Sequence, residues 1–340
     1  MVDAVETMAW AGETPWHGLG DKVSNNLTPE QMVVASKTNW LVEKRELFYK
    51  GKDGEFIKVP QKFGLTRDID DRHLSIVGQT WKPVQNADGF DFFKKFVTAG
   101  KMKMETAGSL HDGKYVWALA RIGSDFKVHG DEMRGYLLLC IPHVFGKAFV
   151  IKFTPIRVVC WNTLTMALGA SLTGERTRGG HFHMPHSMEF DSTMKEAAEE
   201  SLGIAKDQMT EFKQVTEMLT KVKVDEKDTE KYFAEVLRFD AEKEIAKRLK
   251  DNKRKRHVEN VTADMVEPRM LNKLREAFHH GPGAQLTTAR GTLWGAVNAV
   301  TFVVDHELGR DQSASLRTAW LGGKAALKRR ALDLAVERAA

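Results

Sequence analysis

The sequence has few cysteines and no segment that suits a membrane. Cys140 and Cys160 are the 2 cysteines among 340 residues, and no second cysteine stands at CxxC spacing. Both lie in apolar runs, so we expect reduced core thiols rather than a disulfide or a zinc ligand. No apolar run approaches the roughly 18 residues that a membrane helix needs, and the amino terminus lacks a signal-peptide pattern. These absences predict a cytoplasmic protein.

Motifs of several common enzyme classes are also missing. The chain contains no GxxxxGK[ST], GxSxG or HExxH sequence, and no GxGxxG that opens a helix after a strand. These absences argue against P-loop nucleotide hydrolysis and α/β-hydrolase chemistry. We therefore expect no cofactor and assign no catalytic residue. Whether the protein is an enzyme stays open, and the non-enzyme reading is favoured.

Charge is more informative than these absences. The formal net charge is +5 and the pI is about 9.0, which suits a partner that carries phosphates. Acidic residues at 225–230 precede basic residues at 243–256, as in a long helix that complements its own dipole. The densest basic run is Lys253, Arg254, Lys255 and Arg256. This run exceeds what dipole complementation needs, so the alternative is contact with a nucleic-acid backbone.

Residue patterns favour strands in the first half and helices in the second. Short segments rich in β-branched and aromatic residues recur up to about residue 188, interrupted by one helix that begins near Asn86. The clearest hairpin turns at Asp112 and Gly113. We predict an α+β fold, with a meandering antiparallel sheet and a prominent hairpin in the N-terminal half and a helical C-terminal half. Residues 1–188 would form a β-rich domain, and residues 189–340 a helical region that packs on it or extends from it.

One predicted helix, at 287–308, has an unusual second face. Beside its apolar face, a semi-polar stripe includes Trp294 and Asn298 at heptad-like spacing. Such a stripe suits contact with another helix or another subunit. The alternative is that its polar groups are buried and bonded within the monomer.

The predicted hairpin has features of a nucleic-acid platform. Tyr115, Trp117 and Arg121 share one face of its second strand, and Lys101 and Lys103 share a face of the first. Single-stranded nucleic acid stacks its bases on aromatic rings and pairs its phosphates with cations. The alternative is that both aromatic residues are buried in the core. Further predicted phosphate contacts are Arg157, Arg176, Arg178 and the run at 253–256.

Three histidines raise the question of a metal site. His181, His183 and His186 lie within six residues, and an HxH pair with a third histidine can supply nitrogen ligands to zinc. Glu189 or Asp191 would then be a further ligand or a base. The preceding basic, glycine-rich residues 176–180 disfavour a cation. We therefore favour a basic mobile loop over a metal centre.

Seven segments resemble one protein family in the expected order. They are WHGLG (16–20), LTPEQM (27–32), WKPVQN (81–86), ETAGSL (105–110), VWALARI (116–122), FTPIRVVCWNTL (153–164) and TLWGAVNAVTFVVDH (292–306). They are similar to a family of phage- and plasmid-encoded proteins that is defined by a domain of unknown function, DUF932. The resemblance implies a mobile-element protein in a bacterial cell and carries over no catalytic residue. The predicted layout also resembles Rad52-like single-strand annealing proteins, which form oligomers on single-stranded DNA, although fold does not imply function.

Three hypotheses of function follow. The leading one is a homo-oligomeric protein that binds single-stranded DNA in recombination or replication, acting in strand annealing without a covalent step. The second is a metal-dependent hydrolase or nuclease that uses the three histidines. The third is an interaction protein that inhibits a host defence enzyme.

Overall fold

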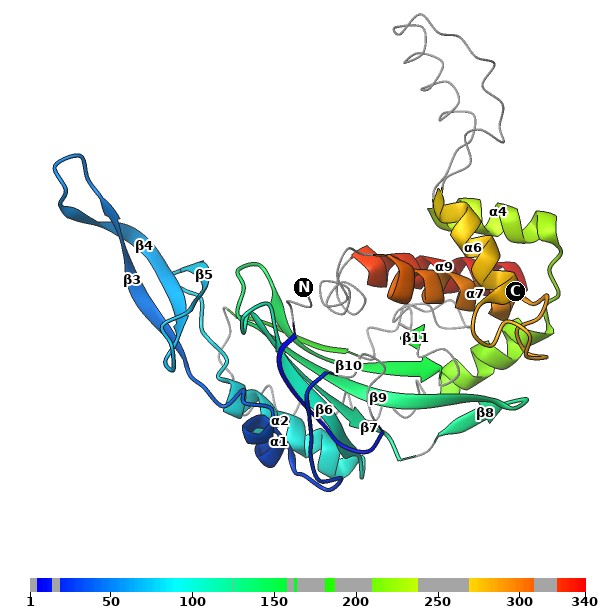
Figure 1. Cartoon of the computed structure of the whole chain (residues 1–340), viewed down its shortest axis with the longest axis horizontal. Helices are drawn as coiled ribbons and strands as arrows, with labels where there is room; N and C mark the ends of the chain where they lie inside the picture. Colours follow the sequence, from blue (N-terminus) through cyan, green and yellow to red (C-terminus); the bar gives the residue numbers. More distant parts are fainter. Residues whose placement is uncertain are drawn as a thin grey trace, which may run out of the picture.

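The chain folds into two β-sheets with helices that lie mostly in its C-terminal half, which confirms the predicted α+β class (Figure 1). The computed structural model describes residues 5–13, 19–123, 125–157, 162–163, 181–186, 210–237, 269–308 and 323–340. The predicted domain boundary at residue 188 lies outside these ranges. Among the described residues, no helix is both long and apolar enough to cross a membrane.

The larger sheet, sheet A, has nine strands. They are β1 (Val5–Trp10), β2 (Asp21–Lys22), β6 (Lys103–Leu110), β7 (Tyr115–Arg121), β8 (Phe126–Val128), β9 (Asp131–Pro142), β10 (Ala148–Arg157), β11 (Asn162–Thr163) and β12 (His181–Pro185). Its main path runs β11-β10-β9-β7-β6-β1-β2, with β12 paired to β10 and β8 to β9. All these pairs are antiparallel except β1 with β2. The predicted hairpin is β6–β7, and the left-handed backbone of Asp112 and Gly113 forms its turn.

A second, smaller sheet forms a projecting arm. Its strands are β3 (Val42–Lys50), β4 (Phe56–Arg67) and β5 (His73–Gly78), in the antiparallel order β3-β4-β5. Figure 1 shows β3 and β4 reaching away from sheet A. The early strands therefore divide between two sheets, since the chain leaves the smaller sheet after β5 and enters α2.

Two helices cover one face of sheet A. These are α1 (Pro29–Ala35) and α2 (Asn86–Ala99), and their apolar residues join those of the sheet in one buried cluster. The prediction missed α1, although Thr28 and Gln31 form a capping box that is visible as TPEQ in the sequence. Gln85 stands at the N-cap of α2, while the predicted cap Asn86 is buried and donates to the carbonyl of Trp40.

The remaining helices form a second layer beside sheet A. They are α4 (Glu226–Leu237), α6 (Arg269–His280), α7 (Leu293–Phe302), the π-helical turn η2 (Val303–Glu307) and α9 (Gly323–Ala339), together with the helical residues 210–221. Their buried cluster includes Met133 and Phe153, which lie on the same face of the sheet as Leu137, so part of this layer packs at the end of the face that α1 and α2 cover. Figure 1 shows α7 and α9 on the side of the sheet away from α1 and α2.

Polar side chains of α7 bond within the chain. The indole Nε1 of Trp294 donates to Asp131 Oδ2 at 3.2 Å, and Asn298 donates to the carbonyl of Trp294 at 2.8 Å. All three residues are buried. The semi-polar stripe therefore serves intrachain packing, and Asp131 at the start of β9 anchors the helical layer to the sheet.

A buried ion pair lies within the helical layer, close to the sheet. Lys328 of α9 donates to Asp305 of η2 at 2.7 Å, and both side chains are almost fully buried. Lys152 of β10 is also buried, and burial together with the cations of Lys328 and Arg329 lowers its pKa to about 7. Because two buried amines lie near one another, the carboxylate of Asp305 is a necessary counter-charge.

Asp305→Asn should destabilise the protein strongly. It would leave the Lys328 ammonium buried beside a neutral amide, which costs on the order of 3 kcal/mol. Glu307→Gln is the matched control, since Glu307 pairs with Lys273 at 2.9 Å where both side chains are about one-third exposed. We expect the control to cost less than about 1 kcal/mol. Urea unfolding of both variants measures the difference, and equal costs would contradict the role given to Asp305.

Candidate nucleic-acid interface

The aromatic residues of the predicted platform are buried. Tyr115 and Trp117 are 5% and 2% exposed, in a cluster with Met8, Trp10 and Leu138 on one face of sheet A. In this conformation neither ring is open to a base in solution. Stacking on these two residues stays a prediction that needs the cluster to open.

Arg121, a predicted phosphate contact, lies in a network of charges at the end of the hairpin. Its guanidinium bonds to the carboxylate of Asp125 and lies 4.0 Å from Glu105. The hydroxyl of Tyr136 donates to Glu105 at 2.8 Å. Burial raises the pKa of the Glu105 carboxyl, in spite of the nearby cations. Arg121 is thus largely neutralised by its neighbours, and a phosphate would have to displace Asp125.

A second arginine in this network is held more firmly. Arg134 is nearly buried and donates to Glu13 at 2.8 Å, a bond that raises the pKa of the guanidinium and lowers that of the carboxyl. For Arg157, another predicted phosphate contact, the structure describes only the backbone, which belongs to β10. Arg176, Arg178 and the run at 253–256 lie outside the described residues.

Two of the three histidines of the possible metal site lie on a strand, so the predicted mobile loop is wrong for them. His181 and His183 lie on β12, opposite Lys152 and Val150 of β10, and their side chains are outside the description. His186 follows the strand, is buried, and stacks on Trp81 with ring centroids 4.1 Å apart. Its Nδ1 lies 3.0 Å from the carbonyl oxygen of Lys82. This places His186 in the packing between β12 and the segment before α2.

Within the described part of the chain, no group of three His, Cys, Asp or Glu residues could hold a metal ion. Glu189 and Asp191, the suggested further ligands, lie outside that part, as does Cys160. Cys140 is buried in the cluster with Trp117 and Leu138, in accordance with the expected core role.

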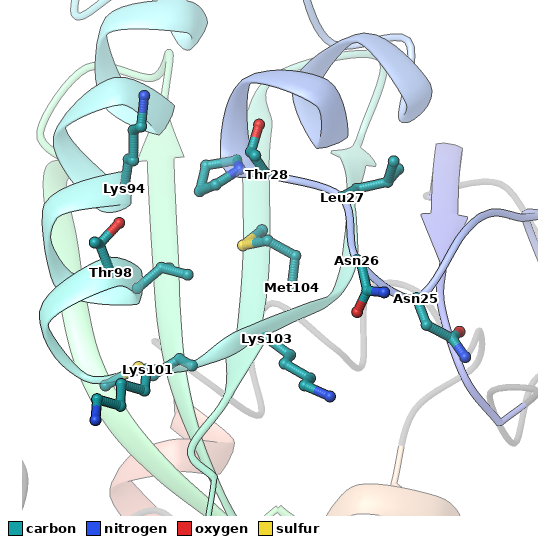
Figure 2. A pocket seen from close by; sticks show the side chains of 12 residues that line it. Asn25, Asn26, Leu27, Thr28, Lys94, Thr98, Lys101, Lys103 and Met104 are labelled. Atoms are coloured by element: carbon teal, nitrogen blue, oxygen red, sulfur yellow. The ribbon is translucent and has the colours of Figure 1, made fainter.

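The accessible cations of the hairpin border a pocket between α1, α2 and β6. Figure 2 shows Met104 near its centre, with Lys94, Lys101 and Lys103 around it. The cavity has a volume of about 330 Å³, within the range of pockets that take small ligands. Lys103 is also paired across the strands with Arg121, so the pocket lies next to one of the predicted phosphate contacts.

The pocket combines an apolar floor with a polar rim. Its floor consists of Leu27, Val97, Met102 and Met104, and its rim carries the three lysines with Asn25, Asn26, Thr28 and Thr98. Lys94 pairs with Glu30, and this hydrogen bond raises the pKa of the amine. Lys101 and Lys103 are exposed and pair with no carboxylate of the described residues. Their charge is therefore available to an anion.

Sequence reasoning noted Lys101 and Lys103 but missed the rest of this pocket. Residues 25–29 belong to it because α1 begins at Pro29 and turns the preceding segment against α2. The TPEQ capping box was the available signal for that helix start. Nothing in the sequence pattern alone brings Asn25 next to Lys101.

Comparison with known proteins gives a family and no function. A family model described as a domain of unknown function, DUF932, matches residues 73–321. Searches of curated proteins and of solved structures gave no match.

The buried His143 should make the folded state sensitive to acid. His143 contacts Asn86, with Nε2 2.8 Å from Oδ1, and burial, helped by His186, lowers the pKa of His143 to about 3. Its pKa in the unfolded chain is about 6.5, so below that pH the unfolded state binds a proton that the folded state does not. The contribution of neutral His143 to stability is therefore present above about pH 6.5 and is lost as the pH falls toward 3. We expect a loss of about 2 kcal/mol between pH 7 and pH 5.

His143→Gln tests this, because glutamine can still donate to Asn86 but does not titrate. Urea unfolding at both pH values should give a smaller pH effect for this variant than for the wild type. His73→Gln, at an exposed position, serves as the control. A pH effect that is equal in all three proteins would show that His143 is not responsible.

Proposed function

The chain belongs to the DUF932 family, and from the chemistry of its surface we propose that it binds single-stranded DNA without catalysing a covalent step. The observation that carries this proposal is the pocket of Figure 2, in which an apolar floor lies beside two exposed lysines. A nucleotide has two parts that complement these features: a flat ring for the apolar floor and an anionic phosphate for the lysines. The basic net charge of +5 favours such a partner.

A single nucleotide would bind in the pocket in one orientation. Its base would lie against the apolar floor of Leu27, Val97, Met102 and Met104, where burial of apolar surface favours all four bases alike. The amides of Asn25 and Asn26 would bond to the edge of the base or to the sugar. The phosphates on either side would pair with Lys101 and Lys103. Such contacts bind with little sequence preference and with strong dependence on salt.

The wider role follows from the resemblance to annealing proteins rather than from the pocket. We propose that the protein acts as a homo-oligomer on single-stranded DNA during recombination or replication of a phage or plasmid, in the cytoplasm of a bacterial host. Strand annealing fits this role because it needs no covalent chemistry.

Lys101→Ala combined with Lys103→Ala should weaken binding to a labelled oligothymidylate. We expect Kd to rise roughly tenfold, and the slope of log K against log salt to fall by about 1.4, or about 0.7 for each phosphate that no longer pairs with a lysine. The matched control is Lys221→Ala with Lys227→Ala, which removes the same charge from exposed positions in the helical layer. Fluorescence anisotropy over a salt series measures both quantities.

Each outcome is informative. An equal loss in the control pair would mean that net charge alone drives binding and would contradict the pocket. Absence of binding by the wild type at low salt would overturn the proposed function. The histidine-dependent hydrolase and the host-protein inhibitor would then be tested by metal analysis and by co-purification with host proteins.

A further inference from the structure

The outer part of the β3–β4 arm carries exposed aromatic side chains that the fold does not use. Phe48, Tyr49 and Phe56 are 51%, 54% and 76% exposed. None of the residues at 43–59 belongs to the described buried apolar clusters, whereas Val42 and Leu65 at the base of the arm do. Large exposed aromatics that gather in one place indicate a binding surface.

A large, irregular bulge separates this outer part from the base. Glu46 pairs with Phe63 and Phe48 pairs with Lys58, so residues 59–62 of β4 stand opposite Leu47 alone. Pro60 lies in the bulge and cannot donate to a ladder, and Gln61 has a φ of 57°. Beyond the bulge β4 no longer pairs with β5, and β3 and β4 continue as a two-stranded ribbon.

The tip of the ribbon is a closed turn. The Gly51 amide donates to the carbonyl of Glu55 at 2.8 Å, and Gly54 takes a φ of 86° that glycine allows without strain. The turn fixes the register of the two strands next to it. It therefore also fixes which side chains share a face.

One face of the ribbon alternates aromatic rings and cations. Phe48 lies directly across from Lys58, and Lys50 directly across from Phe56. Partners in an antiparallel pair share a face, as do residues two apart on one strand, so these four side chains form a two-by-two checkerboard. All four are exposed. Lys58 bonds to Glu46, and Lys50 has no carboxylate partner among the described residues. Tyr49 and Ile57 form the corresponding pair on the other face.

We propose that this checkerboard binds single-stranded DNA, with bases stacked on Phe48 and Phe56 and phosphates paired with Lys50 and Lys58. The ion pair of Lys58 with Glu46 is half exposed and contributes little to stability, so a phosphate can replace it. The inference rests on the proposed function and adds a second contact surface to it. Proteins that bind single strands combine aromatic rings, on which bases stack, with cations that follow the backbone. The charge is suitable, since residues 42–67 contain seven basic residues and four acidic ones, a net charge of 7 − 4 = +3.

The edges of the ribbon disfavour a protein strand as the occupant. Among the described residues, no strand pairs with either edge of the outer ribbon, and an unpaired edge can pair with another chain. However, Lys50, Lys52 and Lys58 line the outer ribbon, and Pro60 interrupts β4. Lysine and proline are the residues that natural sheets use to block edge pairing. The faces rather than the edges are thus left for binding.

Phe48→Ala combined with Phe56→Ala should weaken binding to oligothymidylate, by roughly fivefold or more for each ring. Tyr49→Ala is the matched control, because Tyr49 is next to Phe48 on β3 and nearly as exposed, but lies on the opposite face. Salt dependence should change little in the aromatic variants, since their charge is unaltered. Thermal unfolding should be unchanged in all of them, since these side chains lie outside the core.

A direct readout comes from Phe56→Trp. A tryptophan at this exposed position should lose fluorescence when a base stacks on it, relative to the same titration of the wild type. A merely structural role of Phe56 would give no such change.

The outcomes separate this inference from the function on which it rests. If the wild type binds no single strand, the proposed function fails. If it binds and the Phe48 and Phe56 variant binds equally well, or Tyr49→Ala weakens binding as much, the arm proposal is overturned while the proposed function stands. If the aromatic variant instead changes the sedimentation of the DNA-free protein, the arm is a contact between copies, which also overturns the proposal.

Discussion

Strand β9 is buried on both faces, and the rest of the structure depends on this. Leu137, Leu139 and Ile141 point into the cluster with α1 and α2, while Leu138 and Cys140 point to the other side, and all five are at most 3% exposed. Each buried leucine or isoleucine contributes roughly 1.5–3 kcal/mol. A strand of this kind is stable only when both faces are covered. The chain meets this need with α1 and α2 on one face, and on the other face side chains of β1, β6 and β7 join Leu138 and Cys140 in a second buried cluster.

Polar links then fix how these layers lie on the sheet. Asp131 receives bonds from Thr288 and Trp294 of the helical half, and Arg67 at the base of the arm donates to Glu6 of β1 at 2.7 Å. The family match covers residues 73–321, so Glu6 and Arg67 lie outside it. Lys328, the partner of Asp305, also lies outside. The folded unit is therefore larger than the matched domain, because segments on both sides of the match supply buried charged partners.

The sequence contained enough information to predict the strands and the later helices, but not which of these elements pair or pack with one another. The hairpin at Asp112 and Gly113 was predictable because its turn chemistry is local, and α7 lies within the helix predicted at 287–308. The division into two sheets was not predictable, since it depends on contacts between residues far apart in the chain. The pocket escaped for the same reason, because Asn25 and Lys101 meet only after α1 packs on α2. The burial of Trp117 could not be distinguished from a stacking platform, since a β-strand with aromatic alternation looks the same in both cases.

Electrostatics explains why the better binding candidates lie away from the predicted ones. Arginines close to the sheet, such as Arg121 and Arg134, are partly desolvated and must have carboxylate partners to be stable there. A phosphate that approached them would have to compete with a carboxylate that is already in place. Lys50 and Lys101 are exposed and need no such partner, so a phosphate would replace only water and counterions. Contacts of this kind add affinity without disturbing the fold, and the chain offers them where its backbone leaves the doubly covered sheet: at the arm and at the end of α2.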